Sequence, residues 1–172
     1  MPRLRDIVID RPRVLFVGIN PSPKTVECGH HFAGRGNPFW RLMSASGLVP
    51  FEIDHTGDRR IVELGFAMTN LCRRATRAAS ELSAAELNRG KSALQTRIRR
   101  MKPEMVAFVG VSIYRLIFGS DSSPGAGIKP EAICGARIFV LPNPSGLNAS
   151  YPGFRDKLVW FERLRAELDA AG

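Results

Sequence analysis

Short apolar runs alternate with helical repeats along this chain. Four runs are mostly apolar without a regular polar alternation, which is typical of buried strands; they cover residues 13–18, 66–71, 104–110 and 137–142. Apolar spacing and proline positions predict helices at residues 38–46, 59–64, 83–101, 112–118 and 154–170. Ser83 and Glu86 form a capping-box pattern at the start of the third helix, and Pro103 ends it. Residues 120–129, rich in Ser, Gly and Pro, predict a loop.

The alternation of strands and helices predicts an α/β fold, with a parallel sheet that is covered by helices on both faces. In such sheets the functional loops lie beyond the carboxyl ends of the strands. Two strands end in nearly the same residues, VGINPS at 17–22 and LPNPSG at 141–146. We therefore expect both loops to open at one edge of the sheet.

The length of the chain suits one domain with its own core, and no repeat or linker divides it. We therefore interpret residues 1–172 as a single domain. No apolar run is long enough to cross a membrane, and the charged N-terminus lacks the apolar segment of a secretory signal. The three cysteines, Cys28, Cys72 and Cys134, are too widely spaced for a disulfide scaffold, a zinc ribbon or an iron–sulfur cluster. We expect a cytoplasmic protein without a metal, a cofactor or a membrane partner.

The charge balance gives the first indication of a partner. The chain has 25 Lys and Arg against 16 Asp and Glu, a net charge of +9. Such an excess favours a polyanionic partner, usually nucleic acid, although a merely basic surface is also common. Arg73, Arg74, Arg77 and residues 97–102 could contact phosphates. For residues 97–102 we prefer a favourable charge at a helix C-terminus.

Asn20 stands where the first strand leaves the sheet, in the sequence GINPSP. Its amide offers a donor and an acceptor but is no effective general base near neutral pH, so it suits the holding of a water or a substrate oxygen. Pro21 and Pro23 stiffen the backbone around it. The alternative is a simple Asn-Pro turn after a strand, which is the interpretation that Asn20 taken alone favours.

Phe32 lies in the same loop, where no periodic pattern buries it. Its ring could stack on a planar ligand such as a nucleobase, or hold the loop against the core, which is the commoner role of a single Phe. Cys28, His30 and His31 are a weak indication of a metal, because adjacent histidines point different ways on a strand and no matching ligand cluster follows. We expect the histidines to form loop hydrogen bonds or to contact a phosphate.

The second loop, NPSGLN at residues 143–148, places Leu147 after a glycine in an exposed turn. An exposed leucine usually has no special role, but on a basic protein it could be a wedge that enters between base pairs. Asn70 ends the middle strand, so Asn20, Asn70 and Asn143 are expected at the same edge. This set suits the reading of a base better than nucleophilic catalysis, and no Ser-His-Asp arrangement, P-loop or GxGxxG motif is present.

Five motifs follow one another in an order that is found in a known family. They are GINP at 18–21, HHF at 30–32, GNPFW at 36–40, TNL at 69–71 and NPSGL at 143–147. Each alone is a weak signal. Together, from about residue 13 to the last helix, they make the chain resemble the mismatch-specific uracil/thymine-DNA glycosylases of the uracil-DNA glycosylase superfamily.

The resemblance implies a three-layer α/β/α sandwich with a central four-stranded parallel sheet. It implies a monomeric, monofunctional DNA N-glycosylase without a cofactor, which works on double-stranded DNA (in the nucleoid, if the source is bacterial) and removes uracil or a related damaged base opposite guanine. Asn20 would hold the attacking water, and the Phe32 ring would stack on the base. The implied base pocket comprises Ile19, Ser22, Thr25, His31, Phe32, Asn70 and Asn143, and the implied DNA wedge comprises Ser145, Gly146, Leu147 and Asn148.

Elementary chemistry agrees with these roles. A base inside a duplex must be flipped out, at a cost of roughly a few kcal/mol that is least for a mismatched pair. Hydrogen-bond donors would then stabilise the anionic leaving base. Because Asn20 is no base, we expect water to attack late, and turnover to be slower than in superfamily members with a carboxylate at this position.

Three positions depart from the family pattern. Ser22 replaces a glycine of the best-known members, which could tighten or rehydrate the pocket floor. Thr25 occupies a position that in the family lies near the 5-substituent of the base, so its branched side chain should favour uracil over thymine. Ala149 stands where some members have an arginine, which leaves the strength of the wedge open.

Two alternatives to the uracil glycosylase remain. One is a superfamily glycosylase that prefers hypoxanthine or etheno-adducts. The other is a non-catalytic DNA-binding domain of the same fold, against which the retained Asn20 argues.

Overall fold

The computed structural model describes residues 3–172, which form five strands in one sheet with the order β2-β1-β3-β5-β4. Four strands run parallel: β1 (Val14–Gly18), β2 (Phe66–Asn70), β3 (Met105–Val109) and β5 (Ala136–Leu141). The edge strand β4 (Gly127–Ile133) pairs antiparallel with β5.

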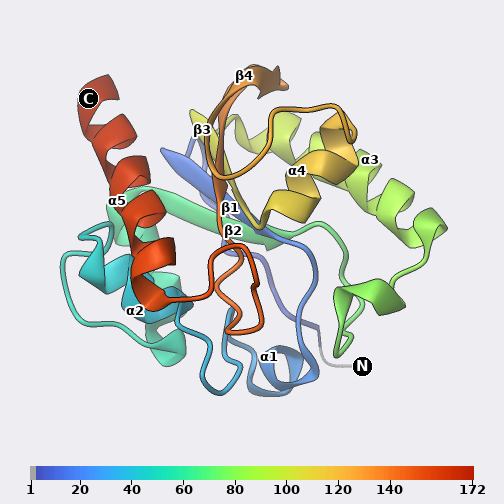
Figure 1. Cartoon of the computed structure of the whole chain (residues 1–172), viewed down its shortest axis with the longest axis horizontal. Helices are drawn as coiled ribbons and strands as arrows, with labels where there is room; N and C mark the ends of the chain where they lie inside the picture. The colour runs from blue at the N-terminus through green and yellow to red at the C-terminus, as the bar shows by residue number, and fades with distance from the viewer. Residues whose placement is uncertain (1–2) are drawn as a thin grey trace.

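Helices cover both faces of the sheet (Figure 1). One face packs against α2 (Phe39–Ala45), the 3-10 helix η1 (His55–Leu64) and α5 (Phe154–Ala171). The other packs against α3 (Ala84–Met101) and α4 (Val111–Phe118). Two short helices, α1 (Pro23–Cys28) and η2 (Ala79–Glu81), lie in the connections.

Neighbouring residues of one strand enter different cores, which explains the unbroken apolar runs. In β1, Val14 and Phe16 belong to the core under α2 and α5, while Leu15 and Val17 belong to the core under α3 and α4. A strand with helices on both faces has no solvent side, so no polar residue interrupts it. Within residues 3–172, no helix combines the length and the apolar content that a membrane crossing requires.

The predicted three-layer α/β/α fold and its four parallel strands are confirmed, and the sheet has a fifth, antiparallel strand that was not predicted. Residues 127–129, which we predicted as the end of a loop, begin β4. This strand contains Pro130, and its pairing with β5 shifts register between Lys129 and Ala132. Proline is tolerated at such an irregularity on an edge strand, where a missing N–H costs little.

The predicted helices are present with small changes. The capping box of α3 is formed, since Ser83 Oγ accepts from Glu86 N at 3.1 Å and the Glu86 carboxylate accepts from Ser83 N at 2.7 Å. The helix predicted at 59–64 is the end of η1, which begins at His55. The short helix α1 was not predicted.

Candidate active site

Both polar loops open at the carboxyl edge of the sheet, as predicted. Gly18 ends β1 directly beside Asn70, the last residue of β2, and Asn143 follows the end of β5. Figure 1 shows α1 and the loop that leads into α5 at this same lower edge. This is the position at which parallel α/β sheets bind ligands.

The exit from β1 is held against the segment that follows β2. Leu71 N donates to Gly18 O at 2.8 Å, Cys72 N to Ile19 O at 2.8 Å and Thr76 N to Pro21 O at 3.2 Å. The pairing of the two strands thus continues past their ends. The backbone of Ile19 and Asn20 is fixed by these bonds and by the following proline.

The Asn20 carboxamide has a single orientation. Its Nδ2 donates to the backbone carbonyl of Arg74 at 2.9 Å and lies 2.7 Å from Thr76 Oγ1. A carbonyl oxygen only accepts, so the NH₂ group must face Arg74. The opposite oxygen, Oδ1, has no hydrogen-bond partner in the described part of the chain and belongs to a half-buried side chain. The site therefore presents a fixed acceptor oxygen.

Phe32 and Asn70 lie against the end of β1. A Cβ atom on Gly18 would lie only 2.5 Å from Asn70 Oδ1 and 3.5 Å from Phe32 Cζ. Phe32 has a left-handed backbone, with φ 52°, and its half-buried ring stacks on Phe39 with centroids 4.0 Å apart and planes 19° apart. The absence of a side chain at Gly18 is what lets these groups approach.

Asp58 holds the loop that carries Phe32. Its carboxylate is only 1% exposed; Oδ1 lies 3.0 Å from His30 Nδ1, and Oδ2 accepts from His31 N at 2.8 Å. Trp40 Nε1 donates to His31 O at 2.8 Å. Both backbone polar groups of His31, the residue before Phe32, are therefore held by hydrogen bonds.

The His31 ring is part of this anchor. It is 2% exposed, and its Nε2 lies 2.9 Å from the backbone oxygen of Arg5. Burial lowers the pKa of His31 below its ordinary value, and this outweighs the opposing effects of the Arg5 carbonyl and Asp58. The role of this residue in a base pocket stays a prediction; its contacts here are with the loop and the N-terminal segment. Within residues 3–172, no three His, Cys, Asp or Glu side chains gather as a metal site would require.

Ser22 and Thr25 join α1 to the same loop. Ser22 Oγ caps α1 by accepting from Thr25 N at 3.2 Å, and it donates to Thr25 Oγ1 at 3.0 Å. Thr25 is buried, and its Oγ1 also accepts from Ala33 N at 3.3 Å. The two positions that depart from the family pattern thus share one hydrogen-bond network beside Phe32.

The second loop is closed by its own hydrogen bonds. Asn143 Oδ1 accepts from Ser145 N at 2.9 Å, Ser145 Oγ accepts from Leu147 N at 3.2 Å, and Asn148 Nδ2 donates to Asn143 O at 3.0 Å. The loop presents Leu147, which is 95% exposed, and a Cβ atom on Gly146 would have no neighbour within 4 Å. The exposure of Leu147 is compatible with the predicted wedge, whose role stays a prediction.

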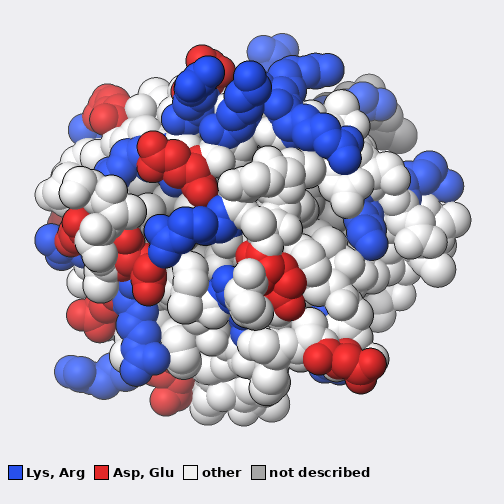
Figure 2. All heavy atoms as spheres, turned by 90° about the horizontal axis from the view of Figure 1, so that it is seen from above, with Lys and Arg blue, Asp and Glu red and all other residues white. Residues whose placement is uncertain are grey.

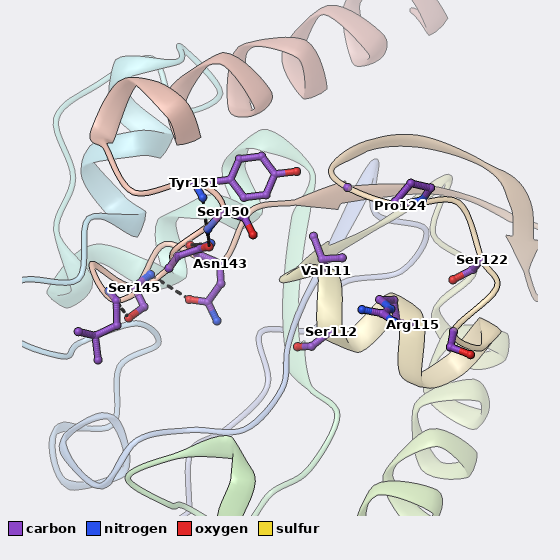
Figure 3. A pocket seen from close by; sticks show the side chains of 13 residues that line it. Val111, Ser112, Arg115, Ser122, Pro124, Asn143, Ser145, Ser150 and Tyr151 are labelled. Carbon is purple, nitrogen blue, oxygen red and sulfur yellow. Dashed lines mark hydrogen bonds between the residues drawn. The ribbon is translucent and has the colours of Figure 1, made fainter.

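A cavity of about 650 Å³ lies behind this loop (Figure 3). Asn143, Ser145, Leu147 and Asn148 form one wall. The other walls come from the start of α4, the loop before β4 and the segment before α5: Val111, Ser112, Arg115, Ser120, Ser122, Pro124, Gly125, Ser150 and Tyr151. Asn20, Phe32 and Asn70 do not line this cavity.

Ser112, Arg115 and Tyr151 line this cavity and were not among the residues that the sequence predicted for the site. Figure 3 shows Ser112 and Arg115 on α4, across from Asn143 and Tyr151. The Tyr151 hydroxyl accepts from Ala126 N at 2.9 Å and so joins two walls of the cavity. Ser112 could have been found, because it follows the end of β3 just as Asn20 and Asn143 follow β1 and β5.

Comparison with known proteins gives relatives that are all described as uracil DNA glycosylases. The family model described as the uracil DNA glycosylase superfamily matches residues 6–168. The chain is 27% identical over 164 residues to a G/U mismatch-specific uracil DNA glycosylase of Schizosaccharomyces pombe; the match covers 90% of this chain and spans only half the length of that protein. A solution structure of a candidate uracil DNA glycosylase from Methanosarcina acetivorans has a similar fold, with TM-score 0.61, 17% identity and coverage of 95% of this chain and 97% of that one.

Proposed function

Because the chain belongs to the uracil DNA glycosylase superfamily, we propose that it is a monofunctional DNA N-glycosylase that removes uracil mispaired with guanine and leaves an abasic site. The observation that carries this proposal is the Asn20 carboxamide, fixed through Nδ2 with Oδ1 left as a free acceptor. A domain that only binds DNA has no need of such a group.

The reaction begins when the target nucleotide leaves the base stack. Leu147 enters the duplex at the vacated position, with Ser145, Gly146 and Asn148 shaping the loop around it. Extrusion is least costly at a mismatch, since less pairing is lost there. This gives the wedge a preference for mispaired uracil without a specific contact to it.

The flipped base then meets the groups at the end of β1. The Phe32 ring stacks on it, Asn70 lies beside it, and backbone groups of Ile19 and Phe32 bind its polar edge. Electron density moves to the base as the glycosidic bond breaks, and donors at its edge stabilise the developing anion. Asn20 Oδ1 accepts a hydrogen bond from a water and holds it below the sugar. The water attacks a sugar that is already cationic, and the proton passes to solvent or to the departing base, because an amide cannot keep it.

Phosphate groups fit the cavity behind the second loop. Arg115 supplies a positive charge there, and the hydroxyls of Ser112, Ser145 and Ser150 supply donors. These contacts would fix the position of the strand that carries the flipped nucleotide. Such phosphate contacts do not depend on the base sequence, which suits an enzyme that must find a lesion in any sequence.

We also propose that the protein acts as a monomer, inside the cell, on double-stranded DNA. Two observations support this: the three cysteines form no disulfide, and each proposed contact with the lesion comes from this one chain. Thr25 should favour uracil over thymine because its branched side chain is fixed by Ser22 and Ala33 beside the Phe32 loop.

Labelled duplexes with a single G·U, G·T or A·U pair, and single-stranded uracil DNA, test the proposal. After incubation with the protein, alkaline treatment should cut the G·U duplex at the uracil and nowhere else, with less cutting of the G·T duplex. Duplexes with hypoxanthine or an etheno-adduct separate the other glycosylase specificities. If no abasic site forms on any substrate while the protein still binds DNA, the chain is a binding domain and the proposal is wrong.

A further inference from the structure

A cluster of basic side chains lies at the sheet edge opposite the candidate active site. Figure 2 views the molecule from above, toward the edge at which the parallel strands begin, and shows Lys and Arg side chains gathered along the upper border of this face, with Asp and Glu side chains nearer its middle. The residues that the fold brings to this place are Arg11, Arg13, Arg99, Arg100 and Lys102. We call them the basic edge.

Backbone hydrogen bonds bring two chain segments together at the basic edge. Arg11 N donates to the oxygen of Met101, the residue between Arg100 and Lys102, at 2.8 Å. Arg13, directly before β1, donates its N–H to Gly65 O at 2.7 Å. The cluster therefore results from tertiary structure and is not a run of charge along one helix.

The five cations of the basic edge have no carboxylate partner. All five are exposed, and none forms an ion pair with the carboxylates of residues 3–172. The nearby Arg137 is different, because Glu167 neutralises it at 2.7 Å. Glu63 and Asp169 line a hollow together with Arg13, but their carboxylates pair with Arg60 and Arg165 and not with the cluster.

The charge at the end of α3 explains only part of the cluster. Arg99 and Arg100 lie in the last turn of α3 and Lys102 caps it, so they favour the negative end of the helix dipole. Arg11 and Arg13 belong to no helix and gain nothing in this way. Five like charges that repel one another at one edge indicate a polyanionic partner.

We propose that the basic edge binds a second segment of double-stranded DNA while the carboxyl edge holds the lesion. A duplex at Leu147 cannot also reach the basic edge, because DNA is stiff over about 150 base pairs and the sheet separates the two edges. The partner is therefore another duplex or a distant part of the same one. This inference rests on the proposed function only for the site of the first duplex.

The chemistry of the basic edge favours a duplex over a single strand. Single-stranded nucleic acid is held by exposed aromatic rings on which bases stack. The Phe66 ring, which lies beneath Arg13, is only 2% exposed and packs inside the core. Arg and Lys without a stacking surface bind phosphates only, and they bind them independently of sequence.

A direct test offers two duplexes to one protein. The first duplex contains 2′-fluorinated deoxyuridine opposite guanine. The electron-poor sugar of this nucleotide resists cleavage. The duplex is added until the protein is saturated. A second, fluorescent duplex without uracil is then titrated at low salt, with anisotropy for affinity and sedimentation for stoichiometry. We expect a complex of one protein with two duplexes. Because both measurements are of binding, they stay valid even if the protein has no glycosylase activity.

Two variants assign the second site. The triple variant Arg99→Gln, Arg100→Gln, Lys102→Gln should weaken binding of the second duplex about tenfold or more and reduce the dependence of its log affinity on log salt by up to about 2.7, since each phosphate contact contributes about 0.9. The double variant Arg11→Gln, Arg13→Gln should weaken it as well, without touching α3. Both should bind the first duplex as the wild type does.

A matched control removes three other exposed cations, by Arg59→Gln, Arg89→Gln and Arg163→Gln. A complex that stays at one duplex per protein would overturn the proposal, as would equal losses in the control and in the triple variant. Tighter binding of single-stranded DNA, or full competition by polyglutamate at equal charge, would also overturn it, in favour of another partner.

Discussion

Asn20 Nδ2 donates to the backbone carbonyl of Arg74 at 2.9 Å, across 54 residues of sequence. The bond fixes which end of the carboxamide faces the solvent side of the site. The amide nitrogen is used by the protein, and the oxygen remains for a substrate or a water. The pairing of β1 with β2 makes this possible, because it carries residues 71–76 past the end of β1.

Thr76 is the second partner of the Asn20 amide. Thr76→Val keeps the shape but removes the Oγ1 acceptor at 2.7 Å from Nδ2. The loss of one hydrogen bond, worth about 1 kcal/mol, should lower the single-turnover rate on a G·U duplex about fivefold. Thr76→Ser keeps the hydroxyl and is the control. Equal rates for the Val and Ser variants would mean that Thr76 does not position Asn20.

Gly18 permits the close approach of Asn70 and Phe32. Gly18→Ala places a Cβ atom 2.5 Å from Asn70 Oδ1, so Asn70 must move. We expect a loss of stability of about 1–3 kcal/mol, as for overpacked cores, and a large fall in cleavage. Adding Asn70→Ala should restore most of the stability, because it removes the colliding atom. Urea unfolding of both single variants and of the double variant measures this coupling, and strictly additive effects would contradict it.

Leu147 acts only on duplex DNA in this account. Leu147→Ala should change the free energy of unfolding by no more than about 0.5 kcal/mol, because the side chain is 95% exposed. It should slow the cleavage of a G·U duplex, because the flipped nucleotide is no longer replaced by a side chain in the base stack. Val8→Ala, at another exposed apolar side chain, is the matched control. A cleavage rate of Leu147→Ala equal to that of Val8→Ala would show that Leu147 is no wedge.

His31 makes stability depend on pH. Burial lowers its pKa in the folded protein below the ordinary value of 6.5, so that the unfolded chain binds a proton more readily. The stabilising contribution is present above pH 6.5 and is lost as the pH falls from there toward the lowered pKa. Urea unfolding at pH 7.5 and pH 5.5 should therefore show lower stability at pH 5.5. His31→Gln should reduce that difference, and an unchanged difference would contradict the assignment.

The sequence predicts a strand or a helix well where one local pattern determines it. Phe16 and Val17 enter opposite cores, so β1 is apolar throughout and easily recognised. The edge strand β4 is half-exposed and contains Pro130, which makes it similar to a loop in sequence. The six residues of α1 are too few for a helical repeat, and their helix depends on the cap at Ser22.

The site is predictable in part for the same reason. The strand-end rule places Asn20, Asn70 and Asn143 at one edge, and the structure has them there. The groups that fix them come from distant sequence: Asp58 holds His31 across 27 residues, and Thr76 meets Asn20 across 56. No pattern marks such pairs. The structure supplies them because sheet pairing and helix packing bring the segments together.

The most direct test of the central role given to Asn20 is single-turnover cleavage of a G·U duplex by the wild type and by Asn20→Ala, with affinity for an uncleavable G·U duplex measured in parallel. We predict that the rate falls by about 100-fold or more, the scale expected for a group that acts on the reacting atoms, while the affinity changes by less than about twofold. A rate within about twofold of the wild type at full affinity would contradict the account, because the fixed acceptor at Asn20 would then have no part in the chemistry.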